Sequence, residues 1–264
     1  MHLHFLGTAG YHPNETRHTS CLFIPEAGLM LDAGSGLFRA TPLIQRDTLD
    51  ILLSHAHLDH IFGLTFVLDV IYKTQLTTIR VHGEREKLEA IQRHLFADLL
   101  FPVLPKIEWL PIEDQPQDFI IGDAKVRWFP LEHPGGSVGY RLDWPSVSIA
   151  YVTDTTSRPD SAYWKEVSGV DWLVHECNFT DTEQDFAVLT GHSWASAVLE
   201  NAARAKITRL ILTHMNPLAT GSDPLKLSTT TASHVGSSPS NLIVAEYQLI
   251  IPLVATCTKF QSSS

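Results

Sequence analysis

The sequence has few cysteines, no long apolar run and no excess of basic residues, and each deficit excludes a class of protein. Its three cysteines, Cys21, Cys177 and Cys257, are far apart and odd in number, so they indicate neither a disulfide framework nor a CxxC metal site. No stretch approaches the roughly 18 apolar residues of a spanning helix, and the start lacks the basic segment and apolar core of a secretory signal. We therefore expect a cytoplasmic protein that does not enter a membrane.

Basic residues are outnumbered, with 19 Lys and Arg against 29 Asp and Glu and a formal net charge of −10. Neutralising nucleic-acid phosphates needs clustered Lys and Arg, so this balance argues against an extended nucleic-acid surface. The 264 residues, 44% of them hydrophobic, suffice for a sizeable core. We expect a single domain over 1–264, loop-rich over 217–240, with a flexible tail in the last residues.

Short strand-like segments alternate with helical ones in both halves of the chain, which predicts two packed sheets covered by helices. Helices are predicted over 61–74, over 84–101 with Leu88, Ile91, Leu95 and Leu99 on one face, and over 193–206 with Ser193 as its cap. Strands are predicted over 1–8, 20–28, 29–36, 48–55, 77–83, 106–112, 124–133, 136–144, 146–155, 170–179 and 209–214, with one or two more over 241–254.

Fourteen histidines are many for this length, and several metal-binding side chains crowd into one segment. "SHAHLDH" follows a buried-strand pattern and holds His55, His57, Asp59 and His60. Residues two apart in extended chain point the same way, so His55 and His57 can ligate one ion while the next turn faces a second. Imidazole with carboxylate suits zinc, manganese or iron better than calcium. The alternative, a surface cluster of histidines without metal, fits the spacing after a buried strand less well.

This segment resembles the H-x-H-x-D-H signature of the metallo-β-lactamase fold superfamily, and that superfamily's other landmarks follow in order. "LMLDAGSG" contains Asp32, which the resemblance makes structural. The implied fold is α/β, an αββα sandwich of two mixed β-sheets packed face to face with helices on both outer faces. The implied cofactor is a pair of divalent metal ions, zinc first, with manganese or iron also compatible. By the resemblance one ion is held by His55, His57 and His133, the other by Asp59, His60 and His214, and Asp154 bridges the two.

Two further stretches resemble the ribonuclease Z branch of that superfamily. "WLVHECNF" is similar to its His-Glu-Ala-Thr motif, with Cys177 and Asn178 where Ala and Thr usually stand, and "GHSWASAV" to its His-Ser-Thr motif. The resemblance makes His192 the acid that protonates the leaving group and Glu176 its orienting partner. A carboxylate bonded to an imidazole fixes its tautomer and raises its pKa. A residue without function at a helix start is the alternative for His192, and His175 is expected to be structural.

The chain departs from ribonuclease Z between His133 and Asp154, where residues 134–153 leave no room for that branch's tRNA-gripping arm. It is more similar there to small phosphodiesterases, such as the cyclic-phosphate diesterase of phosphonate breakdown. We therefore expect hydrolysis of a small phosphodiester, cyclic or nucleotide-derived, through a hydroxide shared by two metals. Asp59 would also accept a proton from the nucleophilic water.

Ser137, Gly135 and Gly136 stand beside His133 and are candidates to bind the substrate phosphate, with a plain hairpin turn as the alternative. Two other activities stay open at this stage. A ribonuclease Z-like endonuclease that processes tRNA 3′ ends would use Glu176 and His192 but lacks the arm. In a carboxyl-ester, lactone or thioester hydrolase of the same fold, Glu176 and His192 would have no evident catalytic role. The sequence also leaves open a homodimer through the helix predicted over 84–101.

Overall fold

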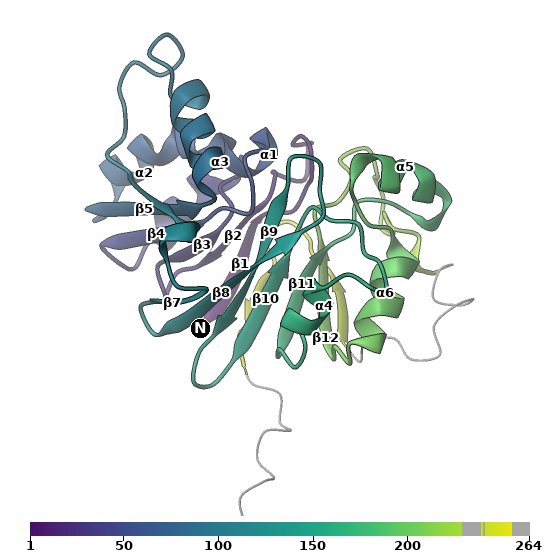
Figure 1. The fold of residues 1–264 in the computed structure, drawn as a ribbon. Helices are drawn as coiled ribbons and strands as arrows, with labels where there is room; N and C mark the ends of the chain where they lie inside the picture. Colours follow the sequence, from purple (N-terminus) through teal and green to yellow (C-terminus); the bar gives the residue numbers. More distant parts are fainter. Residues whose placement is uncertain (229–238, 240, 255–264) are drawn as a thin grey trace, which may run out of the picture.

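Two seven-stranded sheets pack face to face in a computed structural model of the chain, which describes residues 1–228, 239 and 241–254 (Figure 1). The first sheet has the order β14-β1-β2-β3-β4-β5-β6, and the second has the order β13-β12-β11-β10-β9-β8-β7. The strands of the first sheet are β1 His2–Gly7, β2 Cys21–Ile24, β3 Leu29–Leu31, β4 Thr48–Leu52, β5 Thr78–Gly83, β6 Glu108–Pro111 and β14 Ile250–Pro252. Those of the second are β7 Asp118–Ile121, β8 Ala124–Leu131, β9 Ser137–Asp143, β10 Ser148–Val152, β11 Trp172–Glu176, β12 Arg209–Thr213 and β13 Asn241–Val244.

Both sheets are mixed, and the two halves of the chain repeat one pattern. Antiparallel strands come first, β1-β2-β3 in one sheet and β7-β8-β9-β10 in the other. Parallel strands follow, β3 to β6 and β10 to β13. Since parallel strands end at a common edge of a sheet, the loops that follow these strands lie close together in each half of the chain. Such edges are where α/β proteins bind ligands.

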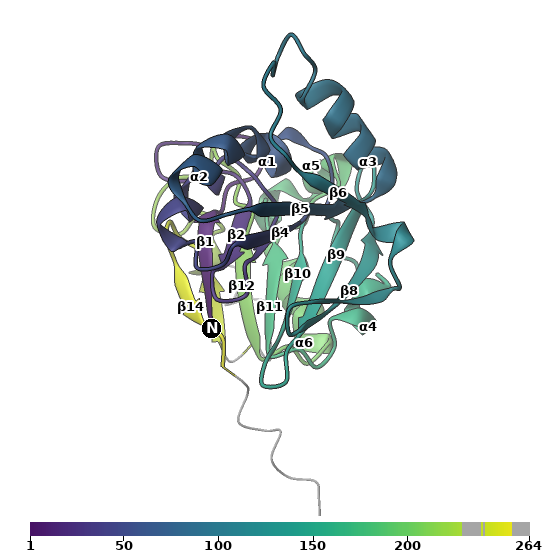
Figure 2. The ribbon, with the colours of Figure 1, turned by 90° about the vertical axis from the view of Figure 1, so that its left-hand side faces the viewer.

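Helices cover both outer faces and make four layers (Figure 2). They are α1 Leu58–Ile61, α2 Val67–Lys73, α3 Arg85–Ala90, α4 Tyr163–Glu166, α5 Gln184–Thr190 and α6 Ala195–Arg204. Three apolar clusters hold the layers together: one between the sheets around Phe5, Tyr140 and Tyr151, one under α2 and α3, and one under α4 and α6. The predicted αββα sandwich is confirmed. None of the helices in the described residues is both long and apolar enough to span a membrane.

The helix predicted over 84–101 is shorter than expected. It runs as α3 and a π-turn over Ile91–Leu95, and the chain then leaves the helical path. The ring of Phe96 packs against Phe101 at 5.1 Å and Trp109 at 6.1 Å. Because Phe96 takes the core position, Leu99 is 99% exposed, and its placement on the buried face was wrong.

Other boundaries also shifted. The segment predicted as helix over 61–74 is divided into the end of α1, a 3-10 turn over Phe62–Phe66 and α2. Ser193 does not cap α6: Trp194 is the N-cap, and the Ser193 hydroxyl donates to the carbonyl of Thr155 instead. Strand β7 and helices α4 and α5 were not predicted. Of the expected loop-rich segment, 229–238 and 240 lie outside the described residues, as does the expected tail beyond 254.

Candidate metal centre

The candidate ligands stand where strands end. His55 follows β4, Asp154 follows β10 and His214 follows β12, so the loops of both sheets meet at one edge. Asp154 and His214 have left-handed backbones, with φ of 31° and 58°, and so does Asp32 after β3, with φ of 57°. This conformation is costly for residues other than glycine and is found at functional sites that the surrounding fold holds in place.

The structure brings all seven predicted metal ligands together in two adjoining groups. Within each group the ligand atoms lie within 4.8 Å of one another, and the groups are His55, His57, His133, Asp154 and Asp59, His60, Asp154, His214. Asp154 belongs to both groups and turns one oxygen to each. Its Oδ2 lies 3.5 Å from His55 Nε2 and 3.6 Å from His133 Nε2. Its Oδ1 lies 3.2 Å from His60 Nε2 and 3.1 Å from His214 Nε2.

Buried acceptors fix the tautomers of two of these histidines. The Nδ1–H of His60 donates to Asp32 Oδ2 at 2.8 Å, and that of His133 donates to the carbonyl of Gly191 at 2.9 Å. Each ring therefore turns its Nε2 atom to the centre, the arrangement by which an outer hydrogen bond orients a metal-binding histidine. Asp32 also accepts from the Tyr151 hydroxyl at 2.8 Å, so its predicted structural role agrees with its contacts.

The inner atoms of the site fit a cation. His55 Nε2 is buried with no hydrogen-bond partner, and burial lowers the pKa of His55 to about 3, which keeps this ring neutral. The Nε2 atoms of His60 and His214 face each other at 3.1 Å. Neutral imidazole and ionised carboxylate are the donor set that zinc, manganese and iron accept. The residues present therefore match a site for divalent metal.

Asp59 carries the charge of the second group. Its Oδ2 lies 3.3 Å from His214 Nε2 and 3.4 Å from His60 Nε2, and it accepts the backbone N–H of Tyr11 at 2.7 Å. Burial opposes ionisation of this carboxyl, but the two imidazoles hold its pKa well below the usual range. Asp59 is thus an anion at neutral pH.

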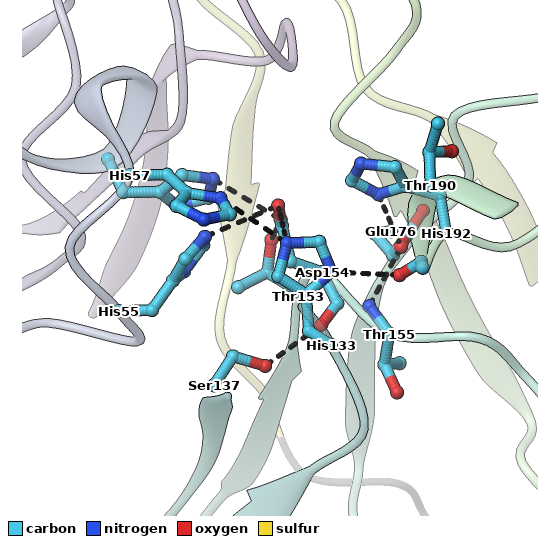
Figure 3. Close-up of polar contacts among 12 residues, drawn as sticks. His55, His57, His133, Ser137, Thr153, Asp154, Thr155, Glu176, Thr190 and His192 are labelled. Carbon is cyan, nitrogen blue, oxygen red and sulfur yellow. Dashed lines mark hydrogen bonds and ion pairs between the residues drawn. The ribbon is translucent and has the colours of Figure 1, made fainter. Parts of the chain in front are cut away.

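Glu176 and His192 form a pair beside the two groups (Figure 3). Glu176 is fully buried at the end of β11, and its Oε1 accepts from His192 Nδ1 at 3.0 Å. Burial lowers the pKa of His192, but the Glu176 carboxylate outweighs it and raises that pKa to about 9. The His192 ring lies 5.1 Å from the ring of His133 and 5.3 Å from that of His214. An imidazolium is therefore held next to the candidate metal site.

The Glu176 carboxylate is close enough to His192 and His214 to form a third group of ligand type. Its oxygens, however, accept backbone N–H groups of Thr155, Asn178 and Ser193 at 2.9, 3.2 and 3.3 Å. With His192 as a fourth donor, the carboxylate is saturated, and it orients His192 rather than binding an ion.

Ser137 and its neighbouring glycines lie beside the site, and Ser137 and Gly136 are committed to internal hydrogen bonds. The Ser137 hydroxyl donates to the carbonyl of Asp154 at 2.8 Å, and the N–H of Gly136 donates to the carbonyl of His133 at 2.8 Å. A Cβ added at Gly135, whose φ is +80°, would lie 3.9 Å from His57 Nε2, so this glycine stands beside a candidate ligand and its predicted contact with substrate stays a prediction. The expected donation from Ser137 and Gly136 to a substrate is therefore not supported, because these hydrogens orient Asp154 and close the turn after His133.

His175 lies behind the site, as expected. It is fully buried, stacks on Trp164 at 5.5 Å between ring centres, and bonds to the Tyr163 hydroxyl at 2.8 Å. Its ring contacts the scaffold under Glu176 and no candidate ligand.

Two contributors escaped the sequence analysis. A Cβ on Gly10 would lie 2.3 Å from His214 Cε1 and 2.7 Å from Asn178 Nδ2, so only glycine allows the loop after β1 to close over the His214 ring. The amide of Asn178 donates to the carbonyl of His214 at 3.0 Å and lies 3.2 Å from its Nδ1. In the sequence, Asn178 was notable only because it replaces the usual Thr of the His-Glu-Ala-Thr motif. Nothing in the sequence indicates that it lies near Gly10.

A cavity of about 810 Å³ opens above the two groups. Besides Asp59 and three histidines of the site, its wall is mainly apolar and aromatic. The lining residues are Tyr11, His12, Ala56, His57, Leu58, Asp59, His133, Pro134, Asn178, Phe179, Phe186, Thr190, His192, Asn216, Pro217 and Leu218. A small substrate would reach the candidate ligands and His192 from this space.

Comparisons with known proteins agree with the geometry. The model of the beta-lactamase superfamily domain matches residues 29–215. The chain is 26% identical over 274 residues to ribonuclease Z of Exiguobacterium sibiricum, covering 82% of this chain and 89% of that protein. The metallo-beta-lactamase fold protein YhfI from Bacillus subtilis superposes with a TM-score of 0.74 at 19% identity, covering 95% and 98% of the two chains. A diphosphatase of the PhnP family superposes with a TM-score of 0.70 at 18% identity, covering 97% and 99%.

Proposed function

The chain belongs to the beta-lactamase superfamily domain family, and on this premise we propose that it is a metal-dependent hydrolase of a small phosphodiester. The observation that carries the proposal is the pair of Glu176 and His192 beside the candidate ligands. A phosphodiester expels a strongly basic alkoxide, which needs a proton as it departs. An imidazolium held by a buried carboxylate next to the metal site supplies that proton.

Two divalent ions, when bound, would lower the pKa of a water molecule and neutralise the charge that develops on the phosphoryl oxygens. The proposed ligands are His55, His57 and His133 for one ion and Asp59, His60 and His214 for the other, with Asp154 common to both. Zinc is the expected metal, and manganese and iron suit the same donors.

The side chains then divide the proton transfers between them. Asp59 lines the cavity beside the candidate ligands, and on this placement we assign it as the acceptor of the proton of the attacking water as the new phosphorus–oxygen bond forms. His192 gives its proton to the leaving oxygen as the old phosphorus–oxygen bond breaks. Glu176 positions the ring by its bond to Nδ1, leaving the Nε2 proton free for donation.

Processing of RNA is the second candidate, favoured by the relative named ribonuclease Z. Two observations favour the small substrate instead. The segment between His133 and Asp154 consists of strands β9 and β10 and their turns, which leave no arm there. Among the described residues, those that line the cavity include no lysine or arginine to meet further phosphates.

Hydrolysis of bis-p-nitrophenyl phosphate and of p-nitrophenyl acetate, each with added zinc or manganese, tests the proposal. We expect release of p-nitrophenol from the diester that chelator abolishes and metal restores. Turnover of the acetate alone would instead indicate an acyl hydrolase.

A second comparison tests His192 itself. The His192→Ala variant should lose far more activity on a diester with an alkyl leaving group than on one with p-nitrophenolate, which departs without a proton. Equal losses on both would remove His192 as the acid. Cleavage of a tRNA precursor without cleavage of either small diester would favour the RNA-processing candidate.

A further inference from the structure

The mouth of the cavity has exposed apolar side chains from four separate segments. Tyr11 is 81% exposed in the loop after β1, Leu58 is 66% exposed at the start of α1, Phe186 is 55% exposed on α5, and Leu218 is 79% exposed after β12. Single exposed apolar residues are ordinary, but several around one cavity mark a binding surface. Segments far apart in the sequence therefore converge on an apolar rim.

One part of this rim adjoins the proposed acid. Phe179 is buried, and its ring contacts Phe186 edge-on at 5.4 Å between centres. The same ring lies 6.1 Å from His192. Phe179 thus backs the exposed ring of Phe186, and a group seated on Phe186 lies next to the reacting end of the cavity.

The charges around the cavity limit what else a substrate can carry. Two divalent ions would bring four positive charges, and Asp59 and Asp154 would cancel two of them. The remaining two match one negatively charged nucleophile and one phosphodiester anion. Within the part of the chain that the structure describes, no lysine or arginine lines the cavity, and Lys87, close to Gly136, is already bonded to Glu84 and to the Gly136 carbonyl. The positive charge of His192 is balanced by the Glu176 carboxylate bonded to it. A second phosphate charge would therefore exceed the positive charge of the site, and unpaired charge in a partly buried site is costly.

We propose that the preferred substrate is a phosphodiester with a single negative charge and an aromatic substituent that packs on Phe186 and Leu218. This inference rests on the proposed function and adds to it the class of substituent. An aromatic ring on the Phe186 face gains ring contact and buries apolar surface that is now in water. A nucleoside or an aryl group has this chemistry, while a methyl ester or a free phosphomonoester does not.

The test compares bis-p-nitrophenyl phosphate with methyl p-nitrophenyl phosphate, which share a leaving group and differ in the retained substituent. We expect the metal-loaded protein to prefer the aromatic diester by about tenfold or more in kcat/KM, mainly through KM. Phe186→Ala and Leu218→Ala should each reduce this preference severalfold. Phe38→Ala is the matched control, because Phe38 is 45% exposed and does not line the cavity. The dianion p-nitrophenyl phosphate should be a poor substrate.

Binding provides a readout apart from turnover. Calorimetric titration of the metal-loaded protein with diphenyl phosphate should show binding that weakens about tenfold in Phe186→Ala and is unchanged in Phe38→Ala. Equal kcat/KM on the aryl and methyl diesters would overturn the inference and leave the proposed function standing. Hydrolysis of neither diester, with the acetate cleaved, would overturn the proposed function itself.

Discussion

Replacing Gly10 by alanine tests how closely the fold must hold His214. The new Cβ would lie 2.3 Å from His214 Cε1 and 2.5 Å from its Nδ1, whereas ordinary contacts begin at 3.4 Å. The ring must therefore recede by the difference, about 1 Å, while metal–ligand distances tolerate only about 0.2 Å. Because Asn178 Nδ2 would also lie 2.7 Å from the Cβ, the ring and its neighbour must move together. We expect the metal affinity of the second group to fall by roughly 10–100-fold, about 1.4–2.7 kcal/mol.

The assay is metal content by elemental analysis after dialysis against graded chelator, which yields an apparent affinity for each variant. Gly83→Ala is the control, since a Cβ there would lie 3.1 Å from the flexible end of Leu88 and in ordinary contact with Leu53 Cβ at 3.5 Å, away from the candidate ligands. Thermal unfolding with excess chelator separates a general loss of stability from a loss of metal. If Gly10→Ala keeps two ions at the chelator concentrations that the unmutated protein tolerates, then the close approach to His214 does not govern metal binding.

Three further outcomes are expected. On a diester with an alkyl leaving group the general acid must be protonated, so activity should fall as pH rises through the His192 pKa of about 9. Glu176→Gln removes the main charge that raises this pKa, so it should move the alkaline limb of the kcat–pH profile to lower pH by at least one unit, with little loss of activity at pH 6. Tyr151→Phe removes a buried donor to Asp32 and should cost about 1–3 kcal/mol in the free energy of unfolding measured in urea, and an unchanged midpoint would count against this bond. Chelator should lower the melting temperature and added zinc should restore it, because an ion that binds only the folded state stabilises it.

Much of the fold followed from local pattern. Buried apolar runs of the right length predicted most of the strands, including β4 and β12, because a strand covered on both faces leaves a continuous signal. Helix ends were less predictable. The segment after Leu95 has leucines at helical spacing, yet Phe96 takes the core position and the chain turns away. Which apolar residue fills a core depends on partners such as Trp109, and these are distant in sequence.

The sequence by itself determined the residue types of the candidate site and their order along the chain. The spacing of His55 to His60 indicated metal, and the superfamily resemblance supplied His133, Asp154 and His214. The tertiary structure decided how these candidate ligands are oriented toward one another. The left-handed backbones at Asp154 and His214, the close approach of Gly10 to the His214 ring, and the hydrogen bonds that turn Nε2 of His60 and His133 inward all depend on contacts between loops that are distant in sequence.

The roles of two further groups were also decided in three dimensions. Ser137 is a plausible phosphate donor by its place beside His133, but in the fold its hydroxyl bonds to the Asp154 carbonyl. The apolar rim has no sequence signature, since Leu58, Phe186 and Leu218 lie on separate elements and each is an ordinary exposed residue alone. Ligand identity is a property of side chains and survives in the sequence. The shape and charge of the space above them depend on which loops the packed sheets bring together, and only the folded chain specifies that.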